Sequence, residues 1–381
     1  MCGRGGYNDT DFLRPAGVLP DGIGVLMITE HDVARARSPR EITEEWEERM
    51  LATAAMRSAC SRGRQRADAP CPFRTAFQRD RDRILHAKSF RRLAGKTQVF
   101  VPPFRSDHDR TRLTHTLEVC QVARTIARAL RLNEDLVEAI ALGHDLGHSP
   151  FGHTGEDALD AVYHAYDPTA HFRHNEHSLR VVDLLERDGR GLNLTWEVRD
   201  GILRHSKGAA DWPCDEAAAT LEGQLVALCD RIAYSSHDID DALRAGLLHA
   251  DDLPANIVSR LGVTHSARLT AMVGDVISAS GSLLAIRMSP AMTELTNQLK
   301  DFMYENLYLS RAMAPRVRAH VRRVVTELFH DGMAHPDTVP GGAEVETTAQ
   351  RARLVCDHIA GMTDQFAEKQ YRRLRRSPRD K

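Results

Sequence analysis

The sequence predicts a mainly α-helical protein, and two observations support this prediction. Apolar residues recur at steps of three and four around His115; they are Leu113, Leu117, Cys120, Ala123, Ile126, Ala127 and Leu130. This spacing puts them on one face of a helix. The segment around Asp230 repeats the pattern with Leu225, Leu228, Cys229 and Ile232. Strand-like runs are few, and KTQVFV at 96–101 is one of them, so we expect at most a small β-hairpin.

The composition is that of an ordinary globular protein. The 381 residues carry a formal net charge of −2, which supplies no general attraction to nucleic acid or membranes. No apolar run approaches the roughly 20 residues that span a bilayer, and the N-terminus lacks the basic start and apolar core of a signal peptide. The seven cysteines form no CxxC pair, which fits reduced thiols. We therefore expect a cytoplasmic protein without a membrane partner.

Three parts are expected along the chain. We expect residues 1–60 to form a variable N-terminal arm and a helix. Residues 61–330 should form the catalytic domain, and residues 331–381 a loop, a C-terminal helix and a basic tail. The basic, Pro-containing stretch 61–72 is typical of a linker. Helices are predicted over residues 42–60, 77–93, 113–130, 135–142, 157–166, 174–185, 225–248, 295–308, 316–329 and 350–374.

The stretch IALGHDLGHSPFGHTGE at 140–156 is the centre of the prediction. An apolar helix runs into a series of glycines that end regular structure. The turn therefore presents His144 and Asp145 side by side, with His148, His153 and Glu156 close behind. Imidazole together with carboxylate suits a divalent cation such as Mn, Fe, Co, Mg or Zn.

Two further residues complete a predicted metal site. His115 lies in the first turn of its amphipathic helix, and Asp230 lies between members of an apolar stripe. A carboxylate in such a place costs several kcal/mol unless it is paired or bound to metal. The set His115, His144, Asp145 and Asp230, each piece on its own helix, therefore predicts a metal site on a helical bundle.

These residues give the chain a resemblance to a known family. The pattern H…HD…D resembles the HD-domain metal-dependent phosphohydrolases and, more narrowly, the dGTPase-like deoxynucleoside triphosphate triphosphohydrolases. The matching stretches, which run from about residue 74 to about 367, are DRDRILHAKSFRRLAGKTQVF, RTRLTHTLEV, GHDLGHSPFGHTGE, FRHNEHSLRVV, GILRHS, CDRIAYSSHDIDDAL and DHIAGMTDQFA. The resemblance implies an HD-type helical bundle with additional peripheral helices.

The resemblance also implies a reaction. Water would cleave between the 5′ oxygen and the α-phosphate, which gives a deoxynucleoside and intact inorganic triphosphate. His153 would act as general acid/base, with Glu156 as its orienting partner. The residues expected to contact the substrate are Arg92, Arg112, His148, His174, Tyr234 and Asp238.

Residue spacing supports some of these contacts. Arg112 lies one helical turn before His115 and can grip phosphate oxygens in bidentate fashion. Tyr234 and Asp238 lie one and two turns past Asp230, so they share its face. The resemblance implies that both lie beside the deoxyribose.

The resemblance implies a divalent cation as cofactor and a dNTP as substrate, but it does not fix the identity of either. Mn²⁺ or Mg²⁺ would be the first cations to try, with Fe, Co and Zn left open. Relatives form dimers or hexamers and many bind an activating dNTP at a second site, so a homo-oligomer is expected and an activator is left open. The basic tail leaves DNA binding open. Base preference among the dNTPs is not predicted.

Two other functions remain as alternatives. One is an HD phosphohydrolase that acts on another nucleotide, against which the GHTGE and YSSHDIDD strings argue. The other is a nucleotide- or DNA-binding regulator with an inactive site. The complete set of metal and proton-transfer residues argues against that second alternative.

Overall fold

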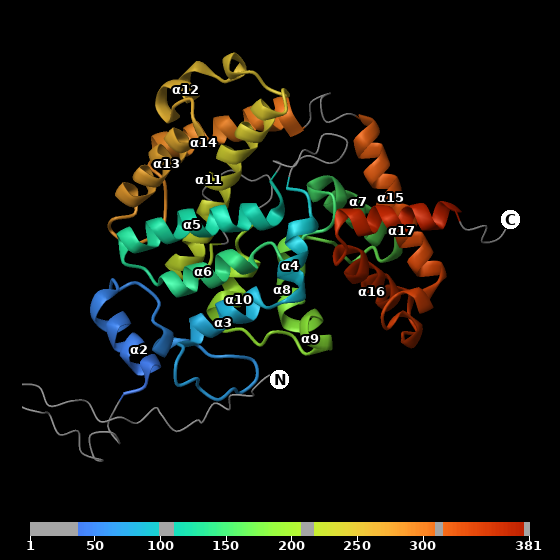
Figure 1. Ribbon diagram of the computed structural model, residues 1–381, viewed down its shortest axis with the longest axis horizontal. Coiled ribbons are helices and arrows are strands. Elements are labelled where there is room, and N and C mark those ends of the chain that lie inside the picture. The colour runs from blue at the N-terminus through green and yellow to red at the C-terminus, as the bar shows by residue number, and fades with distance from the viewer. Residues whose placement is uncertain (1–36, 99–109, 207–216, 309–314, 377–381) are drawn as a thin grey trace, which may run out of the picture. The chain divides into compact units, whose positions relative to one another are not determined.

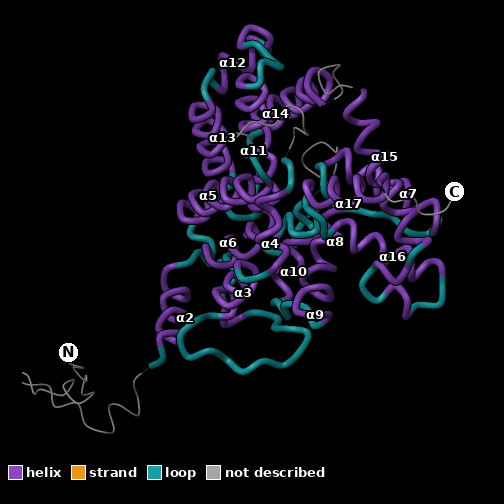
Figure 2. The backbone as a smooth tube through the Cα atoms, turned by 45° about the vertical axis from the view of Figure 1, so that its right-hand side comes forward, coloured by secondary structure: helices purple, strands orange, loops and turns teal. Residues whose placement is uncertain are grey.

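The computed structural model describes residues 37–98, 110–206, 217–308 and 315–376. Helices joined by loops make up this part of the chain (Figures 1 and 2), and it contains two isolated bridges but no β-strand. The predicted mainly α fold is therefore confirmed. The chain divides into residues 1–38 and 39–381, and the elements named below belong to the second unit.

The helices follow one another in this order. The first group is α2 (Pro39–Met50), α3 (Ala76–Leu85), α4 (Lys88–Arg92), α5 (Arg112–Leu130), α6 (Glu134–Gly143), α7 (Gly152–Tyr166), α8 (His174–Arg180), α9 (Glu186–Gly189) and α10 (Trp196–Leu203). The second group is α11 (Leu221–Arg244), α12 (Ala255–Leu261), α13 (His265–Ala279), α14 (Pro290–Met303), α15 (Pro315–Ala334), α16 (Thr348–Ala360) and α17 (Asp364–Arg376). Short 3₁₀ and π-helical turns join some of them. No described helix combines the length and the apolar character that crossing a bilayer requires.

Threonine side chains fix the start of several helices. Thr75, Thr111, Thr220, Thr264 and Thr347 each accept a hydrogen bond from the backbone N–H three residues later. The first turn of a helix leaves its N–H groups without backbone partners, and a hydroxyl at this position satisfies one of them. The starts of α5 and α11, which carry His115 and Asp230, are thus encoded locally.

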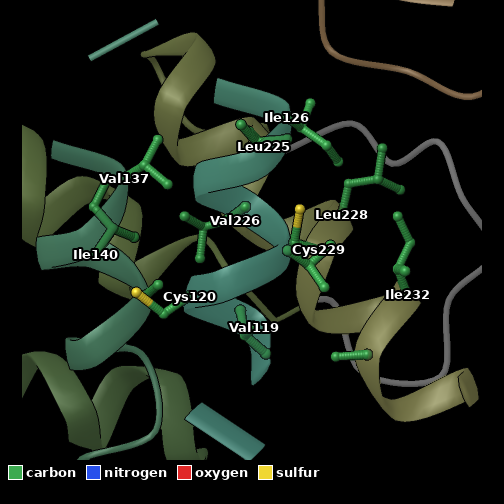
Figure 3. Packing of buried hydrophobic residues seen from close by; sticks show 14 of the residues in the cluster. Val119, Cys120, Ile126, Val137, Ile140, Leu225, Val226, Leu228, Cys229 and Ile232 are labelled. Atoms are coloured by element: carbon green, nitrogen blue, oxygen red, sulfur yellow. The ribbon is translucent and has the colours of Figure 1, made fainter. Parts of the chain in front are cut away.

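Helices α5, α6 and α11 form the centre of the larger hydrophobic core. Their apolar stripes face one another (Figure 3), with Val119 and Ile126 from α5, Ile140 from α6, and Leu225 and Ile232 from α11. All five side chains are fully buried. Burying one such side chain contributes about 1.5–3 kcal/mol, so this packing holds the helices that bear the predicted metal ligands in fixed relation.

A second, smaller core joins α7 to the C-terminal helices. It contains Leu159 and Tyr163 from α7, Phe329 from α15 and Val355 from α16, together with Phe151 just before α7. The residues after 315 therefore pack directly on the helix that carries His153 and Glu156. The predicted division into parts 1–60, 61–330 and 331–381 stays a prediction.

The helix predicted over 42–60 ends earlier, at Met50, and only a 3₁₀ turn at Ser58–Cys60 follows. Two other predicted helices are each broken in the structure. The helix predicted over 77–93 breaks at Ala87, where the Glu186 carboxylate accepts hydrogen bonds from Lys88 N (3.2 Å) and Ser89 N (2.7 Å) and starts α4. The helix predicted over 350–374 breaks after Ala360, whose carbonyl accepts from Lys96 Nζ at 2.8 Å. In both places a distant charged side chain supplies the partner that the continuing helix would have supplied.

Some predicted segments lie outside the described residues. These are residues 1–36 of the N-terminal arm, Val99–Val101 of the strand-like run, most of the loop after His205 and the end of the basic tail. Within the described part of that run, Thr97 forms an isolated bridge with Thr111.

Candidate active site

The predicted metal ligands converge from three helices. His115 lies in the first turn of α5, His144 and Asp145 directly follow α6, and Asp230 lies within α11. The Oδ1 atom of Asp230 is 2.9 Å from His115 Nε2 and 3.9 Å from His144 Nε2. His144 Nε2 is also 3.7 Å from Asp145 Oδ1. The structure thus brings all four side chains together in one cluster, in which His115, His144 and Asp145 are buried and Asp230 is half-buried.

The turn after α6 depends on a glycine. Gly147 N donates a hydrogen bond to Ser178 Oγ at 2.9 Å, and Ser178 Oγ donates to His144 O at 2.6 Å. A Cβ atom on residue 147 would lie 2.1 Å from Ser178 N. No side chain fits there, so glycine lets α8 press against the turn that presents His144 and Asp145.

The imidazole tautomers suit a cation. His144 Nδ1 lies 2.6 Å from the carbonyl of Ala141, and a carbonyl only accepts, so Nδ1 bears the hydrogen and Nε2 a lone pair. His115 Nδ1 lies 2.8 Å from His237 Nε2. The buried Nε2 of His144 has no hydrogen-bond partner among the described residues. Nitrogen lone pairs and carboxylates that converge in this way fit a divalent metal ion.

Arg112 adds positive charge to the cluster. Its Nη1 donates to Asp145 Oδ2 at 2.6 Å, and both side chains are buried. Burial would raise the pKa of Asp145, but Arg112 and the nearby imidazoles hold that pKa well below its ordinary value. Burial would likewise raise the pKa of Asp230, and His115 and His144 outweigh it and lower that pKa. Both carboxylates are therefore ionised at neutral pH.

Three further histidines surround Glu156 beside the metal cluster. The Glu156 carboxylate lies 3.2 Å from His153 Nδ1 and 2.8 Å from His174 Nδ1, and it accepts from His174 N at 2.8 Å. His148 Nε2 lies 3.6 Å away, and its ring stacks on that of His174 with centroids 4.7 Å apart. The His153 side chain is 74% exposed, so it faces solvent while one carboxylate orients its ring.

The charges of this second group differ from residue to residue. Burial would raise the pKa of Glu156, but His174 and His153 bring it well below its ordinary value. Burial would lower the pKa of His174, and Glu156 outweighs it and raises that pKa. Burial, with the charges of Arg112 and His174, lowers the pKa of His148 well below its ordinary value. His148 is therefore a neutral ring at neutral pH.

Comparisons with known proteins agree with this geometry. The HD domain model matches residues 112–235, and the phosphohydrolase-associated domain model matches residues 286–373. A deoxyguanosinetriphosphate triphosphohydrolase-like protein of Caldanaerobacter subterraneus subsp. tengcongensis is 51% identical over 88% of this chain and 95% of its own length. Namesakes from Desulfatibacillum aliphaticivorans (48% identical, 88% and 97% covered) and Geobacter sulfurreducens (40%, 85% and 94%) are also similar. The chain belongs to this HD-domain, dGTPase-like family.

The phosphohydrolase-associated domain contacts the HD-domain turn directly. Asp364 accepts hydrogen bonds from Thr97 N at 3.0 Å, from Thr97 Oγ1 and from Phe151 N at 2.9 Å. Lys96 Nζ donates both to His148 O and to Ala360 O. The start of α17 and the end of α16 thus hold the segment between His148 and His153.

Tyr234, Asp238 and Arg92 are the other residues predicted to contact the substrate, and their surroundings differ. Tyr234 is half-buried on the Asp230 face of α11, where burial raises its pKa. Asp238 is buried, with Oδ1 2.6 Å from His237 Nδ1. Arg92 forms no hydrogen bond or ion pair with the cluster within the part of the chain that the structure describes. Burial, with the charges of Arg92 and Arg112, nevertheless lowers the pKa of Lys96 to about 7, so Arg92 lies within electrostatic reach of the site.

Sequence reasoning missed two histidines of this HD-domain site. His237 places Nε2 2.8 Å from His115 Nδ1. It follows Asp230 by seven residues, a spacing that places both on one face of α11. His205 follows an apolar helix as His144 does, and a nitrogen of its ring lies within 4.8 Å of donor atoms of His144 and Asp230. Both residues lie within the sequence motifs quoted above. The helix face shared with Asp230 could have identified His237, and the position directly after a helix, as for His144, could have identified His205.

Proposed function

We propose that this protein hydrolyses deoxynucleoside triphosphates to deoxynucleoside and inorganic triphosphate with the help of a bound divalent cation. The observation that carries the proposal is the convergence of His115, His144, Asp145 and Asp230 beside Glu156 and its three histidines. The names of the similar proteins support a nucleoside triphosphate as the substrate.

Charge complementarity supports a polyphosphate ligand. Two neutral imidazoles and two carboxylates balance a divalent cation, so the loaded site would not repel an anion. The cation would neutralise phosphate charge and lower the pKa of bound water. Arg112 keeps Nε and Nη2 buried without hydrogen-bond partners among the described residues, and these atoms suit phosphate oxygens. His148, His174 and Arg92 are proposed as further contacts to the triphosphate.

Proton transfer is proposed for His153. In the reaction a water oxygen bonds to the α-phosphorus, the bond to the 5′ oxygen breaks, and that oxygen gains a proton. Glu156 lies 3.2 Å from Nδ1 of His153, so this carboxylate fixes the orientation of the ring. The exposed imidazole can then donate to the departing oxygen and recover a proton from solvent.

Sugar recognition is proposed for α11. Tyr234 shares the face of Asp230 and would pack against the deoxyribose, where a ring beneath C2′ disfavours a ribose hydroxyl. Asp238 would accept a hydrogen bond from the 3′ hydroxyl. Because this carboxylate also contacts His237, a change at Asp238 is expected to affect the metal site as well as sugar binding.

The remaining features stay predictions from the resemblance. They are Mn²⁺ or Mg²⁺ as the cation, with Fe, Co and Zn as alternatives, an activating dNTP at a second site, DNA binding, a homo-oligomer and a cytoplasmic location. The cation, the activator, DNA binding and the oligomeric state can each be measured on the purified chain independently of the reaction, whereas the location requires cell fractionation.

Product analysis tests the proposed reaction. The full-length protein is incubated with each of the four dNTPs and the matching NTPs, with Mn²⁺ or Mg²⁺, and the products are separated by anion exchange. Deoxynucleoside plus triphosphate supports the proposal and ranks the bases. Monophosphate plus pyrophosphate contradicts the proposed bond cleavage. If neither single dNTPs nor mixtures are turned over, the proposed reaction is refuted and the regulator alternative is favoured.

A further inference from the structure

We propose that His205 is a fifth protein ligand of the cation that His115, His144, Asp145 and Asp230 would hold. The inference rests on the metal dependence in the proposed function and is independent of the nucleotide and of the bond cleaved. His205 lies just after α10, and its side chain is buried.

The tautomer of His205 leaves a lone pair for a metal. Its Nδ1 lies 2.7 Å from the carbonyl oxygen of Ile202. A carbonyl only accepts, so Nδ1 bears the hydrogen and Nε2 a lone pair. Nε2 is buried without a hydrogen-bond partner among the described residues. A role in ending the helix uses Nδ1 alone. It does not explain why the second ring nitrogen, Nε2, is buried without a partner, which is energetically unfavourable.

His205 repeats the local arrangement of His144. In both residues Nδ1 meets the carbonyl three residues earlier, at 2.6 Å for His144 and 2.7 Å for His205, and Nε2 is buried without a partner. The two rings lie edge to face with centroids 4.9 Å apart. The same construction thus presents two nitrogen lone pairs at one place.

The donor atoms lie close to the separation that one ion requires. Nitrogen atoms of His144 and His205 and a carboxylate oxygen of Asp230 all lie within 4.8 Å of one another. Ligands on opposite sides of one ion are about 4.2 Å apart, because a metal–nitrogen bond is about 2.1 Å long. Lone pairs this close repel one another unless a cation or a proton lies between them.

Close helix packing builds this arrangement. A Cβ atom on Gly201 of α10 would lie 2.5 Å from Ile140 Cδ1, and one on Gly143 of α6 would lie 2.6 Å from Ile202 Cδ1. The two glycines therefore allow α6 and α10 to pack side by side, and both helices end at the cluster. His205 is held beside His144 by the fold rather than by the chance rotamer of a surface side chain.

The test measures the metal centre without nucleotide. Metal-depleted full-length protein is titrated with Mn²⁺, and X-ray absorption of the loaded protein counts the imidazole ligands. We expect three imidazoles in the wild type and two in His205→Asn. The asparagine amide can still donate to Ile202 O but is too short to reach the cation. The Mn²⁺ affinity of this variant should fall by more than about tenfold, since even groups that only support a ligand contribute about 10–100-fold.

His164→Asn is the matched control. His164 also places Nδ1 near a backbone carbonyl, 3.1 Å from Ala170 O, but it is exposed, so this variant should keep wild-type affinity and imidazole count. Two imidazoles in the wild type overturn the proposal, as does unchanged affinity in His205→Asn. Lower affinity with an unchanged imidazole count also overturns it, because His205 would then be structural. If wild-type protein binds no Mn²⁺, the metal site itself fails and this proposal fails with it.

Discussion

At the scale of single residues, the direction of each imidazole decides what the site can do. His115, His144 and His205 all use Nδ1 to bond the protein, which leaves Nε2 for the cluster. His153 instead points its Nδ1 at Glu156 and leaves the ring exposed. Under the proposed function, one residue type would thus supply metal ligands in the buried half of the site and a proton carrier at its exposed edge.

His153→Ala should separate proton transfer from metal binding. The side chain is largely exposed, so we expect unchanged stability and Mn²⁺ content and a turnover number lower by roughly 10²–10⁴-fold. Steady-state kinetics at saturating dNTP with metal analysis check this. His171→Ala is the control, because His171 is also exposed, beside Asp160 of the same helix. An unchanged turnover number in His153→Ala contradicts the proton-transfer role.

His237 should fix the tautomer of His115. His237→Leu removes the acceptor 2.8 Å from His115 Nδ1, so Mn²⁺ affinity should fall by about 10–100-fold. His237→Gln keeps an acceptor oxygen and should recover part of the affinity. Titration with Mn²⁺ and thermal melting of both variants check this. Equal loss of affinity in both variants would show that His237 serves only packing.

At the scale of elements, α11 depends on a buried carboxyl at its start. Glu222 is fully buried and Oε1 accepts from Met56 N and Asn133 N, both at 3.0 Å. Its Oε2 has no hydrogen-bond partner among the described residues. Burial, which is the largest cause, raises the pKa of Glu222 to about 7. The residue thus ties α11 to the segment after α2 and to the start of α6.

Glu222 should make stability fall as the pH rises. The folded protein keeps a proton on Glu222 up to about pH 7, whereas the unfolded chain loses it near 4.5. The stabilisation is therefore complete below the lower value and is lost as pH rises through the upper one, by up to about 3 kcal/mol. Urea unfolding from pH 5 to 8 should show this loss relative to Glu222→Gln, which cannot ionise. Glu48→Gln, at an exposed position, should retain it; identical pH profiles for wild type and Glu222→Gln contradict the assignment.

At the scale of the whole molecule, the C-terminal helices complete the site that the HD domain begins. Asp364 is buried and bonds Thr97 and Phe151. Phe151 has a φ of 65°, which costs energy for a bulky residue and persists only where surrounding contacts enforce it. The C-terminal part therefore holds the segment that joins His148 to His153.

Asp364→Asn should disturb this segment from a distance. An amide nitrogen would face N–H donors that now meet a carboxylate oxygen, so we expect a loss of about 1–3 kcal/mol in unfolding free energy and a lower turnover number. Mn²⁺ affinity should change less, because His115, His144 and Asp230 lie on other elements. Asp331→Asn is the control, since Asp331 pairs with His335, whose side chain is exposed. Wild-type turnover in Asp364→Asn would contradict the coupling.

The sequence by itself predicted the helical fold, most of its helices and the residue types of the candidate metal site, because these depend on spacing along one chain. Helix periodicity put His115 and Asp230 on the right faces, and glycines marked the turn after α6. Tertiary structure alone decided the breaks at Ala87 and after Ala360, because Glu186 and Lys96 supply hydrogen bonds from distant positions. It also decided the contacts on which the proposals for His205, His237 and Asp364 rest, since a lone pair left without a partner, or a carboxylate that bonds another segment, exists only after the helices have packed.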